Sequence, residues 1–146
     1  KIARCFSFIG PYLPLNGRFA ASDFIHDVLS QQNIMIKGDG KAVRSYLYMA
    51  DLMYGYGRYY SEGNPAGRIM CDLNSHNIYK FAEKFANQST PPLPISIQQK
   101  SSHGAAPDHY VPNTTRAREE LNLHQHIMLS AAIKKTIEWY RNNNTI

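Results

Sequence analysis

The sequence predicts a mixed α/β fold with a partly parallel sheet, and two observations support this prediction. Short apolar runs alternate along the chain with stretches in which apolar residues recur every three or four positions. Clusters of glycine and proline separate these segments. Alternating strands and helices are typical of a sheet with parallel strands. The chain of 146 residues, 43% hydrophobic and 18% charged, is long enough for one domain with a buried core.

The first strand and the first helix are predicted from the N-terminal residues. Residues 2–10, "IARCFSFIG", form an apolar run that ends at Gly10-Pro11, as expected for a buried parallel strand. Ser22 is a good N-cap for the helix that follows. The apolar residues at helical spacing in that helix are Phe24, Ile25, Val28 and Leu29.

Two further strands and a helix are predicted in the next segment. "IMIK", residues 34–37, is a strand that ends at the Gly-Asp-Gly turn of residues 38–40. "VRSYLYM", residues 43–49, is the next strand. Residues 50–60 are predicted to be helical, with one buried side made of Leu52, Tyr56 and Tyr59.

The second half of the chain continues the alternation. A break at residues 63–67 precedes a predicted strand at 68–73, "RIMCDL", and Asn77 is expected to cap a helix that continues to residue 86. Residues 95–99, "ISIQQ", alternate like a half-exposed strand. Thr114 or Thr115 is expected to cap a short helix ending at Leu121. The last predicted helix buries Leu129, Ala132, Ile133, Thr136, Ile137 and Tyr140.

Composition limits the classes of function. Cys5 and Cys71 lie in strand-like runs and are interpreted as buried hydrophobic residues, and no zinc-site spacing is found, so no metal is expected. No apolar run is long enough for a membrane span and no signal peptide is visible, so a cytoplasmic protein without membrane contact is expected. The net charge of +5 favours anionic partners. Because the basic residues are scattered, a phosphorylated small molecule is favoured over nucleic acid.

The residues themselves indicate binding rather than catalysis. No G-x-S-x-G, P-loop or G-x-G-x-x-G motif opens a helix. Arg44 follows the Gly-Asp-Gly turn and opens an apolar strand, and its planar fork suits phosphate oxygens. On residue type alone, an ion pair with a carboxylate such as Asp51 or Asp39 is the favoured alternative. Tyr46 and Tyr48 lie on one face of the same strand and are interpreted as half-buried aromatic residues.

Six ordered segments carry a resemblance to a known family: "ARCFSFIGP", "GRFAASDFIHDVL", "IMIKGDGKAVRSYLYMADL", "GRIMCDLNS", "HYVPNTTRAREELNL" and "AIKKTIEWYR". Together they resemble the C-terminal half of the extended short-chain dehydrogenases/reductases, in the NAD-dependent epimerase/dehydratase group that acts on nucleotide sugars. The branch with UDP-glucuronate decarboxylase and dTDP-glucose dehydratase is the most similar. The resemblance implies the last strands of a Rossmann domain followed by a small mixed α/β substrate-binding lobe.

The resemblance also implies roles for particular residues. Arg44 matches the arginine that grips the nucleotide diphosphate, and Ile36, Lys37 and Gly38 match the segment beside the nucleotide base. Phe8 and Ile9 match the stretch beside the nicotinamide of NAD. The remaining matches to substrate-binding positions are Ser7, where the family usually has asparagine, Arg18 and His109.

The chain also departs from the family pattern. His109 precedes Tyr110 where the family often has arginine, and Cys71-Asp72-Leu73-Asn74 replaces the usual Asn-Val-Gly-Ser. No Tyr-x-x-x-Lys pair occurs in the sequence. The resemblance therefore implies an inactive substrate-binding fragment of an enzyme whose missing N-terminal half binds NAD and holds the catalytic pair.

Three hypotheses remain open, and one expectation concerns assembly. In the first hypothesis the chain is the substrate lobe of a nucleotide-sugar enzyme. In the second it is a non-catalytic module that binds nucleotides or polyanions, and in the third it is a small structural or interaction domain. A strand at residues 2–9 with an unpaired edge predicts a homodimer or association through that strand.

Overall fold

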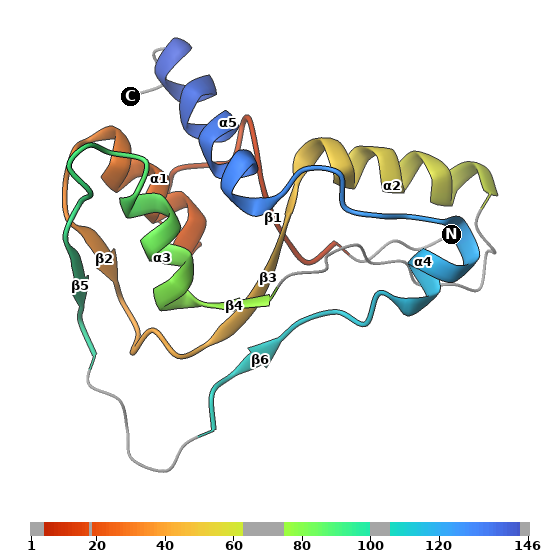
Figure 1. The fold of residues 1–146 in the computed structure, drawn as a ribbon, viewed down its shortest axis with the longest axis horizontal. Coiled ribbons are helices and arrows are strands. Elements are labelled where there is room, and N and C mark those ends of the chain that lie inside the picture. Colours follow the sequence, from red (N-terminus) through yellow and green to blue (C-terminus); the bar gives the residue numbers. More distant parts are fainter. Residues whose placement is uncertain (1–4, 18, 63–74, 100–105, 144–146) are drawn as a thin grey trace.

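The computed structural model describes residues 5–17, 19–62, 75–99 and 106–143. Figure 1 shows the path of the chain. Two predictions, the break at 63–67 and the strand at 68–73, concern residues outside the described ranges.

A single strand organises the larger sheet. The second half of β3 (Val43–Tyr48) pairs in parallel with β1 (Ser7–Ile9), so the predicted parallel pairing is confirmed. The first half of β3 pairs antiparallel with β4 (Ser75–Asn77) and parallel with β6 (His109–Tyr110). Figure 1 shows β3 running through the middle of the molecule, so three segments that are distant in sequence meet along it.

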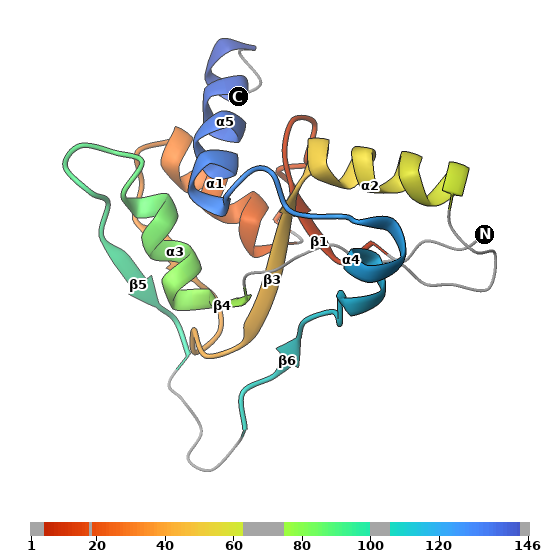
Figure 2. The same cartoon turned by 45° about the vertical axis from the view of Figure 1, so that its right-hand side comes forward.

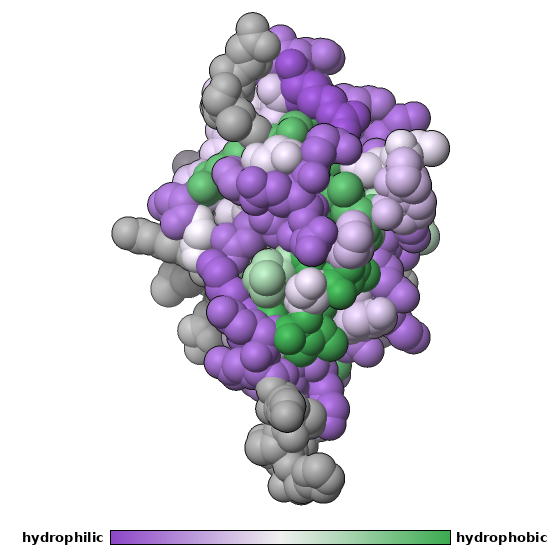
Figure 3. Space-filling view, turned by 90° about the vertical axis from the view of Figure 1, so that its left-hand side faces the viewer, coloured by the Kyte–Doolittle hydropathy of each residue, from purple (hydrophilic) through white to green (hydrophobic). Residues whose placement is uncertain are grey.

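A second, smaller sheet lies at the left of Figure 1, where β2 (Ile34–Ile36) and β5 (Ile95–Ile97) pair in parallel. Both strands were predicted. The side of the molecule that carries them is shown in Figure 3, where hydrophobic residues gather near the centre of a largely hydrophilic surface. Met35 and Ile97 are among the exposed apolar residues, at 39% and 48% exposure.

Three helices surround the main core. α1 (Ala20–Leu29), α3 (Ile78–Ala86) and α5 (Leu129–Asn142) contact one another, and all three carry apolar residues at helical spacing. Figure 2 shows them on the same side of β3 as β5. All six residues expected on the buried face of α5 are buried, as predicted. The largest fully buried residues in this core are Phe24, Phe81, Phe85, Ile9, Ile25, Ile34, Ile36, Ile133, Ile137, Val28 and Thr136.

Two of the three predicted caps, Asn77 and Ser22, have different outcomes. Asn77 caps α3 as expected, because its side chain accepts a hydrogen bond of 2.7 Å from the backbone N–H of Lys80. Ser22 was wrong as the cap of α1: the helix begins at Ala20, and Ser22 lies inside its first turn, fully buried. The local Ser-Asp pattern did not reveal that α1 starts three residues earlier than predicted, with Phe19 rather than Ser22 at the cap position.

The short helix α4 (Thr115–Leu121) was predicted with either threonine as its cap. Thr114 occupies the cap position without a side-chain cap bond, and Asn113 Oδ1 instead accepts a 2.9 Å hydrogen bond from the Thr115 N–H. Cys5 is exposed, so the prediction that it is buried was wrong, while Cys71 lies outside the described residues.

The buried face of α2 (Met49–Glu62) differs from the predicted one. Tyr59 is buried and joins a small second core with α4, but Tyr56 is 50% exposed. Asp51 and Gly55 are buried instead. Asp51 tolerates burial because its carboxylate accepts hydrogen bonds of 3.2 and 2.9 Å from the N–H groups of His126 and Ile127.

None of the helices in the described parts of the chain combines the length and the apolar character that spanning a bilayer requires. The same residues hold no cluster of three or more side chains suited to a metal ion.

Candidate functional site

Arg44 is placed by the turn before β3 and by the strand that flanks it. Asp39 Oδ1 accepts a 3.0 Å hydrogen bond from the Lys41 N–H and closes the turn. Arg44 then pairs through the main chain with His76 of β4 and Tyr110 of β6. Its side chain is 24% exposed. The turn and the pairing of β3 with β4 and β6 together determine the position of the Arg44 side chain.

The guanidinium of Arg44 has a carboxylate partner, though not one of the two predicted. Nη2 forms an ion pair of 2.5 Å with Asp108 Oδ2. Nη1 donates to the backbone carbonyls of Val43, at 2.8 Å, and Asp108, at 3.1 Å. Asp39 and Asp51 were wrong as partners. Asp39 accepts a hydrogen bond within the turn before β3, and Asp51 accepts hydrogen bonds from the backbone just before α5.

Arg44 also lines a cavity of about 330 Å³ between β1, β3 and α1, called here the diphosphate cavity after the ligand group that the resemblance implies for Arg44. Ser7 and Phe8 line the same cavity, so three of the residues predicted to bind substrate or cofactor lie together. Its other lining residues are Phe6, Leu13, Phe19, Ala20, Ala21, Tyr46 and Ile78. Arg44 is therefore both paired to an acid and directed at a cavity.

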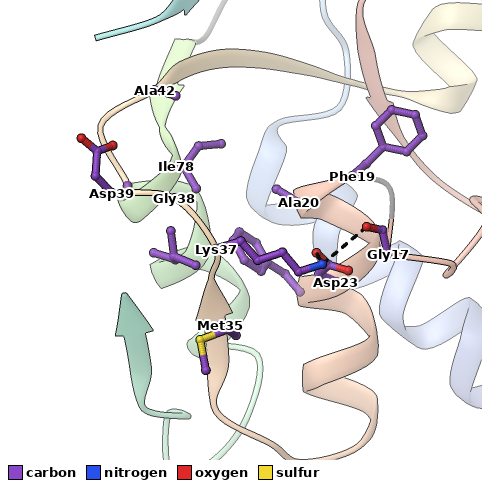
Figure 4. A pocket seen from close by; sticks show the side chains of 13 residues that line it. Gly17, Phe19, Ala20, Asp23, Met35, Lys37, Gly38, Asp39, Ala42 and Ile78 are labelled. Atoms are coloured by element: carbon purple, nitrogen blue, oxygen red, sulfur yellow. Dashed lines mark hydrogen bonds and ion pairs between the residues drawn. The ribbon is translucent and has the colours of Figure 1, made fainter. Parts of the chain in front are cut away.

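A second cavity, of about 220 Å³, lies at the end of β2 and is called here the base cavity, after the nucleotide base that the resemblance implies for residues 36–38. Its lining includes Ile36, Lys37 and Gly38, the segment predicted to run beside a nucleotide base. Figure 4 shows this segment crossing opposite the start of α1. The remaining lining residues are Gly17, Phe19, Ala20, Asp23, Phe24, Met35, Asp39, Gly40, Ala42 and Ile78.

The two cavities have a common wall. Phe19, Ala20 and Ile78 line both of them. Phe19 is 60% exposed although it is a large apolar residue. The common wall makes one elongated ligand able to contact both cavities.

An ion pair crosses the base cavity. Lys37 Nζ lies 2.7 Å from Asp23 Oδ2 in the first turn of α1 and 3.4 Å from the carbonyl oxygen of Gly17. Figure 4 draws these side chains pointing toward one another. The side chain of Lys37 is 61% exposed, so its pair with Asp23 is a weak, solvated one.

Tyr46 forms the inner wall of the diphosphate cavity. Its ring stacks on Phe81 of α3 with centroids 3.7 Å apart and planes 8° from parallel. Burial raises the pKa of Tyr46 far above its ordinary value, and the nearby Arg44 charge opposes this only in part. At neutral pH Tyr46 is therefore uncharged, and it lines the cavity together with Arg44.

Tyr110, rather than His109, brings its side chain to this region. Its ring stacks on Phe6 with centroids 4.3 Å apart, and the guanidinium carbon of Arg44 lies 6.0 Å from its centroid. His109 is exposed and belongs to neither cavity lining. Neighbouring residues of a strand point to opposite faces, so a strand that turns Tyr110 toward Arg44 turns His109 away.

Of the other predicted positions, some line a cavity and some do not. Ile9 is fully buried in the main core and lines neither cavity, whereas its neighbour Phe8 does line one. Arg18 lies outside the described residues. Sequence reasoning missed the wall residues Phe19 and Ile78, which carried no signal beyond being apolar. It also missed Asp108, which lies 64 positions from Arg44.

Known proteins with related sequences or structures were found over nearly the whole chain. No family model matches the sequence. A UDP-glucuronic acid decarboxylase from Arabidopsis thaliana is 25% identical over 142 residues, which cover 97% of this chain and 32% of that protein. The chain thus spans about a third of the length of this relative.

Two solved structures share the fold, and both cover 97% of this chain. An epimerase from Methanothermobacter thermautotrophicus has a TM-score of 0.80 at 20% identity, over 43% of its own chain. A UDP-glucuronic acid 4-epimerase from Bacillus cereus, solved with UDP-glucuronic acid and NAD, has a TM-score of 0.79 at 17% identity, over 45% of its chain. These likenesses confirm the predicted α/β fold as part of a Rossmann-type architecture.

Proposed function

We propose that this chain, a member of the nucleotide-sugar epimerase, dehydratase and decarboxylase family, supplies the surface that binds the nucleoside diphosphate of a sugar substrate. The observation that carries the proposal is the placement of Arg44 in one cavity and of residues 36–38 in the next, with a common wall between them. The diphosphate would contact Arg44, and the base would lie along residues 36–38.

The chemistry of the diphosphate cavity supports this assignment. A guanidinium offers several N–H donors in one plane, a geometry that matches phosphate oxygens. Ser7 adds a hydroxyl at the same cavity, and Phe8 and Tyr46 supply apolar surface. The net charge of +5 further favours an anionic ligand.

The two residues predicted to lie beside NAD, Phe8 and Ile9, are placed differently. Phe8 lines the diphosphate cavity, whereas the side chain of Ile9 is fully buried in the main core. The sequence also contains neither a G-x-G-x-x-G turn nor a Tyr-x-x-x-Lys pair. Binding of NAD, and the redox chemistry that it supplies when bound, would therefore depend mainly on protein outside this chain.

Calorimetry with UDP-glucuronic acid and with UDP tests the proposal. Arg44→Ala removes the charge-assisted hydrogen bonds to the diphosphate and is expected to weaken binding by about 1.5–3 kcal/mol, roughly 10- to 150-fold. Arg44→Lys keeps the charge but loses the planar fork, so an intermediate loss is expected.

Arg118→Ala is the matched control, since Arg118 is an exposed arginine near the end of α4 and its loss changes the net charge equally. Equal affinities for Arg44→Ala and the wild type would remove Arg44 from the site. UDP binding without turnover by this chain is expected under both candidates, the substrate lobe of an enzyme and a non-catalytic nucleotide-binding module. Turnover of UDP-glucuronic acid with NAD by the full-length parent protein would favour the first, and its absence there would favour the second.

The edge of β1 supports a further proposal about assembly. Within the described residues β1 pairs only with β3, which leaves its other edge available for another strand. We therefore expect association through this edge, either with a second copy or with a strand outside this chain. Sedimentation of the isolated chain should show concentration-dependent association, and a monomer at every concentration would contradict the expectation.

A further inference from the structure

The guanidinium of Arg44 is held by two different kinds of partner. Both contacts of Nη1 are with backbone carbonyls, those of Val43 and Asp108. The Asp108 carbonyl also accepts a 2.8 Å hydrogen bond from the Val43 N–H, where β3 and β6 begin to pair. These main-chain contacts belong to the sheet and remain whatever the side chain at position 108 is.

The third contact of the guanidinium is with a side chain and not with the main chain. Nη2 meets the carboxylate of Asp108, which is 73% exposed, whereas the Arg44 side chain is only 24% exposed. A largely buried guanidinium needs an anion nearby, while an exposed carboxylate regains full hydration if it swings away. The carboxylate is therefore the contact that can be lost at the smallest cost.

We propose that Asp108 is an internal competitor for the anion-binding face of Arg44, and that a ligand diphosphate takes the place of its carboxylate. This inference rests on the proposed function. The Nη1 contacts keep the guanidinium at the diphosphate cavity throughout, so the exchange changes only the anion on Nη2. Asp108 thereby lowers the affinity of the site for weakly charged anions and orders Arg44 while no ligand is bound.

The direction of the exchange follows from charge. A nucleoside diphosphate carries more negative charge than one carboxylate and presents several acceptor oxygens to the guanidinium. A single exposed carboxylate contributes little to an ion pair in water. The diphosphate therefore displaces Asp108, and the contact with Asp108 reduces the affinity by a small, measurable factor.

Asp108→Asn tests the competition because it keeps the shape and the main-chain hydrogen bonds but removes the charge. Calorimetry with UDP should show binding that is tighter by about 1.5- to 5-fold, the range for an exposed ion pair. Glu119→Gln, on α4, is the matched control for the loss of one negative charge and should change affinity less. Without ligand, Asp108→Asn should unfold at a Tm no higher than that of the wild type, because the tighter binding comes from the lost competition and not from a more stable fold.

A double-mutant cycle separates competition from other effects of Asp108. In an Arg44→Ala background, Asp108→Asn should no longer tighten UDP binding. Weaker or unchanged binding by Asp108→Asn in the wild-type background would overturn the exchange, as would the same gain in both backgrounds. If Arg44→Ala weakens UDP binding but Asp108→Asn does not tighten it, the competition by Asp108 is overturned and the proposed function stands. If neither the wild type nor any variant binds UDP, both proposals are overturned.

Discussion

The hydroxyl of Tyr140 provides the sharpest test of how the cavities are supported. Tyr140 lies near the end of α5, is 3% exposed, and donates a hydrogen bond to the backbone carbonyl of Leu13, 127 positions away. Leu13 lines the diphosphate cavity. This bond therefore ties the loop after β1 to the last helix.

Tyr140→Phe removes one oxygen atom and leaves the carbonyl of Leu13 buried without that partner. An unsatisfied buried acceptor costs about 1–3 kcal/mol of stability. For a chain of this size, that cost corresponds to a fall in Tm of about 2–12 °C. The apolar contacts of the ring, including its edge-on contact with Trp139, remain in place.

Differential scanning calorimetry of the two proteins at pH 7 provides the measurement. Tyr56→Phe is the matched control, because it removes the same hydroxyl from a helical tyrosine that is 50% exposed, and it should shift Tm by less than 1 °C. If Tyr140→Phe has the same Tm as the wild type, the hydrogen bond contributes nothing to stability and the argument from burial fails. If both variants lose the same stability, a general effect of the substitution is responsible.

Three further predictions concern the frame around the site. Asp51→Ala leaves two backbone N–H groups before α5 without their acceptor and should cost about 2–4 kcal/mol in urea unfolding, whereas Asp51→Asn should recover part of the loss. Gly10→Ala would place a Cβ atom 2.6 Å from Met49 Cβ, so a loss of about 1–3 kcal/mol is expected, and an unchanged urea midpoint would show that β1 and α2 separate freely. Because the folded pKa of Tyr46 is raised, its contribution is fully present below the unfolded pKa of about 10 and is lost as pH rises through the folded pKa. Stability should therefore fall above about pH 10, and Tyr46→Phe should reduce that fall.

Long elements with strong periodicity were predictable from sequence. The buried face of α5 matches the prediction residue by residue, because a 14-residue helix has enough apolar positions to define one face. The α2 face was predicted only in part, with Tyr59 buried as expected but Tyr56 half exposed, for the opposite reason. Its many tyrosines pack as readily at a surface as in a core, and the burial of Asp51 depends on backbone groups 75 and 76 positions away.

The candidate site was predictable only in part. The resemblance to a known family singled out Arg44 and residues 36–38, and the structure brings them to adjoining cavities. The partner of Arg44 could not be found in this way, because Asp108 reaches it through the two-residue strand β6, too short to leave a periodic signal. Whether His109 and Ile9 have the predicted binding roles stays a prediction.

The central position of β3 makes the site sensitive to insertions and deletions. Side chains alternate between the two faces of a strand, so a shift by one residue would exchange the face of Arg44 with that of Ser45, which is 1% exposed. One residue gained or lost in the turn before the strand would thus bury a cation and expose a small hydroxyl. Relatives that keep an arginine on this face of the strand should accordingly vary in the identity of the turn residues but hold their number constant.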